Sequence, residues 1–206
     1  MMPANPVDFR TRRGLAMAPL FSLSETLVFW LTFFGVFIAV ITLGPAKARW
    51  AERQVQRKRL KELSPLYLAL LLLVAILIGY ARIGRLPHWL CYIGEALFVA
   101  GYAFTGLSIR LLGRYYSLNV EVLPDHVLIE KGPYGFIRHP NYLGQLVGAI
   151  GLGLALQSWV AVLVLAVGAG VYFGYRMRIE EAFLVSEVDG YADYRKRTKF
   201  VLPFIL

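Results

Sequence analysis

Long apolar runs alternate with short polar gaps along this chain. A helix needs ~20 mostly apolar residues to cross a bilayer. Five runs approach that length, at residues 21–43, 65–84, 88–110, 140–157 and 159–177. The pattern therefore predicts an all-α integral membrane protein with about five transmembrane helices.

The position of the gaps predicts two parts. Residues 1–110 are expected to form an N-terminal, three-helix membrane part. It includes a basic linker at 44–63 that suits a helix lying on the inner leaflet, because basic amphipathic helices bind anionic lipid. Residues 111–206 are expected to form a core made of the loop between the third and fourth helices, the last two helices and a C-terminal helix.

Composition agrees with a membrane protein. The chain has 206 residues, of which 58% are hydrophobic, and its mean hydropathy is +0.57. The net charge of +9 does not indicate nucleic-acid binding, because the basic residues lie between the apolar runs. The single cysteine, Cys91, excludes an internal disulfide and a cysteine metal cluster. We expect no metal site.

The distribution of Lys and Arg predicts the orientation. With five helices, 17 of the 22 Lys and Arg residues lie on one side. The positive-inside rule then places the N-terminus outside and the C-terminus in the cytoplasm. Arg10, Arg12 and Arg13 precede an apolar run too long for a signal peptide, so we expect no cleaved leader.

A polar, ring-rich stretch at residues 131–144 leads into the fourth apolar run. Pro140 suits the first position of a helix, which makes His139 its N-cap. Arg138 precedes them. An arginine beside the free N–H groups of a first helical turn attracts anions, so the stretch predicts a polar binding site at the membrane surface.

The segment before it, from Leu111 to His139, is too long for a tight connection. Residues 126–130 indicate a short extended piece, which ends at the Gly132-Pro133 turn. Its open N–H and C=O groups suit an adenine edge or a ribose. A plain surface hairpin fits the same residues.

The last two apolar runs are rich in glycine. Gly144 with Gly148, and Gly170 with Gly174, have the spacing that lets helix backbones approach closely in lipid. We therefore expect a tight pair of these two helices, with the start of one beside the end of the other. Arg176, with Glu180 on the same helical face, would then join the Arg138-His139 stretch. The role of Glu95 in the third run stays open.

Residues 119–205 resemble the isoprenylcysteine carboxyl methyltransferase family, and resemble its compact prokaryotic members more than the longer animal ones. The resemblance rests on motifs that occur in the family's order: His126-Val127-Leu128-Ile129, Gly132-Pro133-Tyr134, Arg138-His139-Pro140-Asn141-Tyr142, Arg176 with Glu180-Glu181, Tyr194, and Leu202-Pro203-Phe204-Ile205. It implies a prokaryotic inner-membrane methyltransferase that uses S-adenosylmethionine and releases S-adenosylhomocysteine. Its cytoplasmic cofactor pocket would have no Gly-x-Gly-x-x-Gly motif.

Carried over by position, the resemblance implies cofactor contacts at eleven residues. These are Asn119, His126, Val127, Leu128, Ile129, Tyr134, His139, Pro140, Asn141, Tyr142 and Glu180. Asn119 stands where animal members have glutamine. Arg176 matches the arginine that holds the substrate carboxylate. The implied partners are a lipophilic or lipidated substrate and membrane lipids, while the natural acceptor and the oligomeric state stay open.

Methyl transfer to a carboxylate suits these residues, because that nucleophile is already ionised and an arginine can hold both of its oxygens. Three other functions remain open. A phospholipid N-methyltransferase would need a proton acceptor, such as His139 or Glu181. A sterol-type reductase shares the Arg-His-Pro motif but should bind a nicotinamide cofactor. The third is a membrane protein without catalytic activity.

Overall fold

The computed structural model describes residues 29–35, 65–117 and 126–201. Its helices are α2 (Pro65–Tyr80), α3 (Leu90–Leu112), α4 (Pro140–Ala155), α5 (Trp159–Glu187) and α6 (Tyr191–Arg197), and residues 29–35 are also helical. Two short 3₁₀ helices are η2 (Gly113–Tyr115) and η3 (Gly132–Gly135). These segments contain no strand. The prediction of an all-α fold is confirmed for the described residues.

Two stretches are long and apolar enough to cross a membrane, Leu90–Tyr115 and Trp159–Glu187. Helices α2 and α4 are apolar but shorter, with 16 residues each. Most of the predicted first span, 21–43, and the 44–63 linker lie outside the described residues. The count of five spans therefore stays a prediction.

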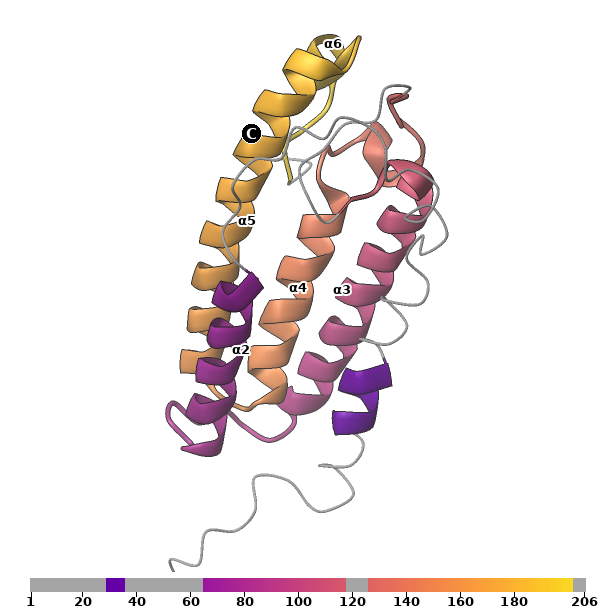
Figure 1. The fold of residues 1–206 in the computed structure, drawn as a ribbon. Helices are drawn as coiled ribbons and strands as arrows, with labels where there is room; N and C mark the ends of the chain where they lie inside the picture. The colour runs from indigo at the N-terminus through magenta and orange to yellow at the C-terminus, as the bar shows by residue number, and fades with distance from the viewer. Residues whose placement is uncertain (1–28, 36–64, 118–125, 202–206) are drawn as a thin grey trace, which may run out of the picture.

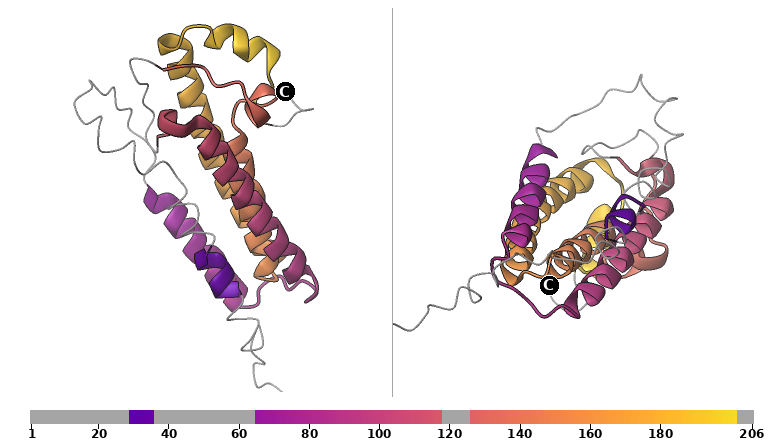
Figure 2. Two further views of the ribbon diagram at one scale, coloured as in Figure 1. Left: turned by 90° about the vertical axis from the view of Figure 1, so that its right-hand side faces the viewer. Right: turned by 90° about the horizontal axis from the view of Figure 1, so that it is seen from below.

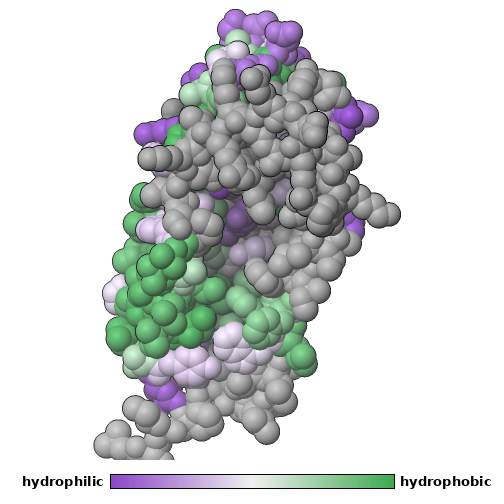
Figure 3. Space-filling model, in the orientation of Figure 1, coloured by the Kyte–Doolittle hydropathy of each residue, from purple (hydrophilic) through white to green (hydrophobic). Residues whose placement is uncertain are grey.

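Helix α2 packs beside α5, α5 beside α4, and α4 beside α3 (Figure 1 and Figure 2). Helix α6 turns back from the end of α5 and lies across that end of the bundle (Figure 2). Apolar side chains cover α2 and the neighbouring surface, whereas polar ones gather around α6 (Figure 3). On this face the described surface is therefore apolar along α2 and polar around α6.

The closest helix contact joins α3 to α4. A Cβ atom added at Gly101 would lie 2.5 Å from the carbonyl oxygen of Gly144 and 2.6 Å from the backbone nitrogen of Gly148. Thr105 strengthens the contact, because its single hydroxyl proton is shared between Gly101 O (3.0 Å) and Asn141 O (3.2 Å). Helix α3 thus fixes where α4 begins.

This contact corrects the predicted glycine pairing. Gly144 and Gly148 face α3 instead of α5, and Gly170 and Gly174 have no atom within 4 Å of an added Cβ in the part of the chain described. Spacing alone predicted a close approach but could not identify the partner, because α3 also contains suitable glycines, such as Gly101. Helix α4 approaches α5 closely at Gly153, where an added Cβ would lie 2.6 Å from the Val162 Cα. Nearer the pocket the two helices meet through larger side chains, including Tyr142, Phe173 and Met177.

The turn between α4 and α5 is fixed by Ser158. Its hydroxyl accepts from the backbone of Ala161 at 3.1 Å, which caps α5. The same hydroxyl donates to the Ile83 carbonyl at 2.6 Å in the loop after α2. From this anchor, α5 runs to Glu187, past the predicted end at residue 177. Arg176 and Glu180 therefore share one continuous helix. Its 29 residues span about 43 Å, which exceeds the ~30 Å hydrocarbon core of a bilayer.

We expect Gly101→Ala to destabilise the bundle by about 1–3 kcal/mol, because the added methyl group meets backbone atoms of α4 that cannot rotate away. Gly106→Ala is the matched control in the same helix, where an added Cβ meets nothing described within 4 Å. Unfolding of the two variants in detergent measures the difference. Equal stability of the two variants would contradict the close α3–α4 contact.

Candidate active site

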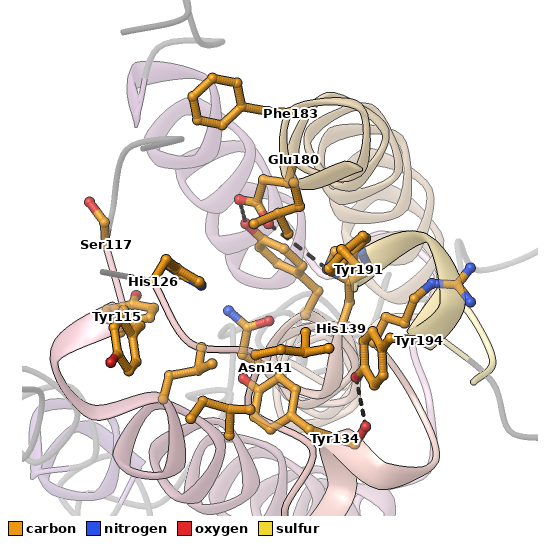
Figure 4. Close-up of a pocket in the computed structure, with 17 residues that line it drawn as sticks. Tyr115, Ser117, His126, Tyr134, His139, Asn141, Glu180, Phe183, Tyr191 and Tyr194 are labelled. Carbon is orange, nitrogen blue, oxygen red and sulfur yellow. Dashed lines mark hydrogen bonds and ion pairs between the residues drawn. The ribbon is translucent and has the colours of Figure 1, made fainter. Parts of the chain in front are cut away.

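A pocket opens at the α6 end of the bundle, between α3, α4, α5 and α6. Figure 4 shows His126, His139, Asn141 and Glu180 around one space, with Tyr115 and Tyr194 on different sides of it. The lining residues are Leu112, Tyr115, Tyr116, Ser117, His126, Leu128, Ile129, Tyr134, Arg138, His139, Asn141, Tyr142, Glu180, Phe183, Leu184, Tyr191 and Tyr194. Tyrosine is the commonest residue type among them.

The floor of the pocket is formed by the segment before α4. The predicted turn is present as η3, where Gly132 has a φ of +60° that suits glycine. Tyr134 in this turn is buried, and its hydroxyl donates to the Ser108 carbonyl of α3 at 3.4 Å. Residues 126–130 take part in no strand or bridge. The hairpin alternative is therefore wrong for these residues.

Helix α4 begins as predicted, with His139 at the N-cap and Pro140 at the first position. The imidazole does not cap its own helix. It is 4% exposed and lies between the two glutamates of α5, with Nδ1 3.9 Å from Glu180 Oε2 and Nε2 3.5 Å from Glu181 Oε1. The positive end of α4 therefore lies beside two carboxylates.

Tyr142 connects Arg176 to Glu180. Its hydroxyl donates to Glu180 Oε1 and accepts from Arg176 Nε at 2.7 Å. Arg176 Nε also lies 3.1 Å from Glu180 Oε1, one helical turn away. The guanidinium is thereby oriented from two sides, by its own helix and by α4.

Arg138 has a different role from the one its sequence position indicates. Its guanidinium pairs with Glu181 through Nε and donates through Nη1 to the carbonyls of Arg195 (3.0 Å) and Thr198. An anion-binding arginine was expected at the start of α4. The structure instead shows Arg138 bound to a buried carboxylate and to two backbone carbonyls at the end of α6.

Helix α6 forms the remaining wall. The hydroxyl of Tyr194 donates to the Tyr134 carbonyl at 2.6 Å, and the backbone of Arg138 pairs with that of Lys199. Burial raises the pKa of Tyr194 to about 12, and burial also raises the pKa of Tyr191. Both side chains are therefore neutral at physiological pH.

Residues 94–186 match the sequence model of the Isoprenylcysteine carboxyl methyltransferase (ICMT) family. This segment contains η3, α4, most of α5 and the Arg176–Tyr142–Glu180 cluster. This segment, a little under half of the chain, is similar to the isoprenylcysteine carboxyl methyltransferase family. The resemblance inferred from the motifs is thereby confirmed.

Two relatives illustrate the range of the family resemblance. Protein-S-isoprenylcysteine O-methyltransferase of Schizosaccharomyces pombe is 37% identical over 82 residues, which are 39% of this chain and 35% of the relative. Cobalt-zinc-cadmium resistance protein CzcN of Cupriavidus metallidurans is 32% identical over 99 residues, 48% of this chain and 46% of the relative. The matches thus span between about a third and a half of these relatives.

Among the described residues, no group of three or more His, Cys, Asp and Glu could hold a metal ion.

The fold resembles a solved member of the family. The eukaryotic intramembrane Ras methyltransferase ICMT superposes with a TM-score of 0.68 over 93% of this chain and 70% of that one, at 23% sequence identity. The described helices therefore share the fold of that protein, and two of them are long and apolar enough to cross a membrane.

The structure brings most of the residues implied by the family resemblance together. The pocket is lined by His126, Leu128, Ile129, Tyr134, His139, Asn141, Tyr142 and Glu180. Val127 is 56% exposed and is not in the lining, and Pro140 is buried in the first turn of α4. Arg176 reaches the wall through Tyr142 and Glu180. Asn119 lies outside the described residues.

Sequence reasoning missed Leu112 on α3, Tyr191 on α6 and two groups of lining residues. Tyr115, Tyr116 and Ser117 follow α3, where no motif marks them, and the Tyr115 ring lies 4.8 Å from that of His126. Phe183 and Leu184 lie three and four residues after Glu180 on α5. That spacing on one helical face was the available signal.

We expect Tyr194→Phe to weaken the attachment of α6, since it leaves the Tyr134 carbonyl without its donor, at a cost of about 1–3 kcal/mol. The pKa of the Tyr194 hydroxyl is about 12 in the folded chain, whereas the ordinary pKa of tyrosine is 10.0. Its contribution is therefore complete below pH 10 and is lost as the pH rises toward 12. Thermal unfolding of both chains near pH 8 and near pH 10.5 tests this. Tyr194→Phe should be less stable than the native chain near pH 8. Its stability should fall less than that of the native chain between pH 8 and pH 10.5, and an equal fall in both chains would contradict the prediction.

Proposed function

We propose that this protein is an S-adenosylmethionine-dependent membrane methyltransferase that methylates the carboxylate of a lipophilic, isoprenylcysteine-like molecule. The observation that carries the proposal is the oriented guanidinium of Arg176. Tyr142 and Glu180 hold it at the wall of a pocket, within the segment that matches the family. The S. pombe relative has protein-S-isoprenylcysteine O-methyltransferase as its name.

The pocket residues suit this cofactor. Tyrosine rings line it, and aromatic faces attract a cation, which suits a sulfonium. Glu180 adds a carboxylate for a hydroxyl or an ammonium group. His126, Leu128 and Ile129, from the segment before η3, also line the pocket, and their backbone groups suit an adenine edge. When bound, S-adenosylmethionine supplies a methyl group made reactive by its positive sulfur.

The protein's contribution is alignment and exclusion of water. A carboxylate is ionised at neutral pH and needs no general base. A guanidinium matches two carboxylate oxygens in a fork, and Tyr142 with Glu180 fixes the direction of that fork in Arg176. Helix α6 covers one side of the pocket with Tyr191 and Tyr194. Covering the pocket excludes water and holds the acceptor in line with the methyl group that is transferred.

Two further parts of the proposal concern the membrane. The α6 end of the bundle would face the cytoplasm, with the N-terminus outside, as the Lys and Arg distribution predicts. The acceptor's apolar tail would remain in the bilayer, which explains why such a site stands at the end of apolar helices. We place the protein in a prokaryotic inner membrane, because the predicted five spans resemble the prokaryotic members of the family.

The phospholipid N-methyltransferase alternative is less well supported. It needs a group that removes a proton from an amine, and His139 and Glu181 were the two candidates. His139 lines the pocket and remains a candidate. Glu181 is buried and forms an ion pair with Arg138. It is not among the residues that line the pocket. The matched family is instead described by carboxyl methylation.

We expect Arg176→Ala to lower kcat/KM for a prenylcysteine analogue by about 10- to 100-fold, because a charged hydrogen-bond partner of the acceptor is lost. Methyl transfer from labelled S-adenosylmethionine measures it. Arg178→Ala is the matched control, since Arg178 lies two residues further on the same helix and is exposed. The control should retain its activity.

Two results would contradict the proposal. The first is equal activity of the two variants, which would remove Arg176 from the site. The second is methylation of a phosphatidylethanolamine by the native chain in place of the prenylcysteine analogue, which would establish the alternative. Calorimetry with S-adenosylhomocysteine separates both from a protein that binds no such cofactor.

A further inference from the structure

Glu181 is a buried acid that the proposed reaction does not use. Its residue is 6% exposed, and it is not among the residues that line the pocket. We propose that Glu181 is a positioning residue, which sets cofactor affinity by holding α6 against the start of α4 without touching the cofactor. The part of this inference that concerns the cofactor rests on the proposed function.

The carboxylate of Glu181 joins its own helix, α5, to the start of α4 and to α6. One oxygen pairs with Arg138 Nε and lies 3.5 Å from His139 Nε2, at the start of α4. The other oxygen lies 3.5 Å from Arg195 Nε on α6. Side-chain exposures of 7% for Glu181 and 9% for Arg138 show that their pair is shielded from water. Removing the carboxylate would leave a buried guanidinium without its counter-charge.

Arg138 transmits this pairing to the backbone at the end of α6. While Nε is held by Glu181, Nη1 donates to the carbonyls of Arg195 and Thr198. These two carbonyls lie at the end of α6, where a helix leaves acceptors without an intrahelical donor. The guanidinium therefore acts as a cap for α6, and Glu181 sets its orientation.

Helix α6 in turn supplies Tyr191 and Tyr194 to the pocket. With seven residues, it is too short to be stable as a helix without tertiary contacts. A second set of contacts joins it to the floor, since Tyr194 donates to the Tyr134 carbonyl and Lys199 pairs with the backbone beside it. Loosening of the Glu181 contacts would therefore move a pocket wall while leaving the Arg176–Tyr142–Glu180 cluster in place.

The test compares Glu181→Gln with the native chain in two measurements. S-adenosylhomocysteine affinity by calorimetry should fall about 10-fold, the scale of a lost charged hydrogen bond. Trypsin cleavage within residues 195–199 should become at least about 10-fold faster. The exposed trypsin sites there are Arg195, Lys196, Arg197 and Lys199. The KM for S-adenosylmethionine should rise while kcat at saturation stays within about threefold, a split that a merely unstable chain would not show.

Asp193→Asn is the matched control. It breaks the Asp193–Lys196 pair on α6, in which both side chains are more than three-quarters exposed (78% and 77%), and exposed pairs contribute little. Both measurements should remain at native values. If Glu181→Gln does not fold, Arg195→Gln replaces it in the calorimetry, because it removes the exposed partner and keeps the Arg138 pair. We expect about a threefold loss of affinity there.

The outcomes separate the two proposals. Unchanged affinity in Glu181→Gln, with or without faster cleavage, overturns the positioning role. Weaker affinity with a parallel fall of kcat also overturns it, because the reacting groups would then have moved. A native chain that binds no S-adenosylhomocysteine refutes the proposed function and, with it, the cofactor part of the inference. The trypsin rates then still decide whether Glu181 holds α6.

Discussion

Two adjacent carboxylates near the end of α5 hold the start of α4 in place. Glu180 contacts Tyr142 and Arg176, and Glu181 contacts Arg138. Charges partly shielded from water must be compensated, and the attraction between them is stronger than in solvent. The pocket walls thus form one connected network, because each acid joins groups from separate parts of the chain.

The frame beneath this network is the contact between α3 and α4. Glycine at position 101 allows two helix backbones to meet, and Thr105 bonds to the first turn of α4. Association of helices in lipid depends on such packing and hydrogen bonds, since burial of apolar surface gives no advantage there. The position of His139 and Tyr142 relative to α5 follows from this frame.

The sequence predicts those features that depend on local chemistry. The helix start at Pro140, the turn at Gly132, and Arg176 with Glu180 on one face follow from backbone preferences and helical spacing. The family motifs added the choice of residues that now line the pocket, although their role as cofactor ligands stays a prediction.

Features that depend on tertiary partners could not be predicted in the same way. Glycine spacing shows that a helix can approach another closely, but the choice of α3 over α5 depends on the whole bundle. Arg138 looked like an anion site because its partner, Glu181, is 43 positions away. Tyr115 joins the pocket from a segment without any motif. The division at residue 110 also stays a prediction.

The central claim is that one pocket holds the methyl donor within reach of an acceptor bound by Arg176. An experimental structure of the chain with S-adenosylhomocysteine and a prenylcysteine analogue tests it most directly. The account predicts the cofactor between His126, Asn141 and Glu180, with the analogue's carboxylate on the Arg176 guanidinium and directed at the cofactor sulfur. A cofactor bound elsewhere, or a carboxylate remote from Arg176, would contradict it.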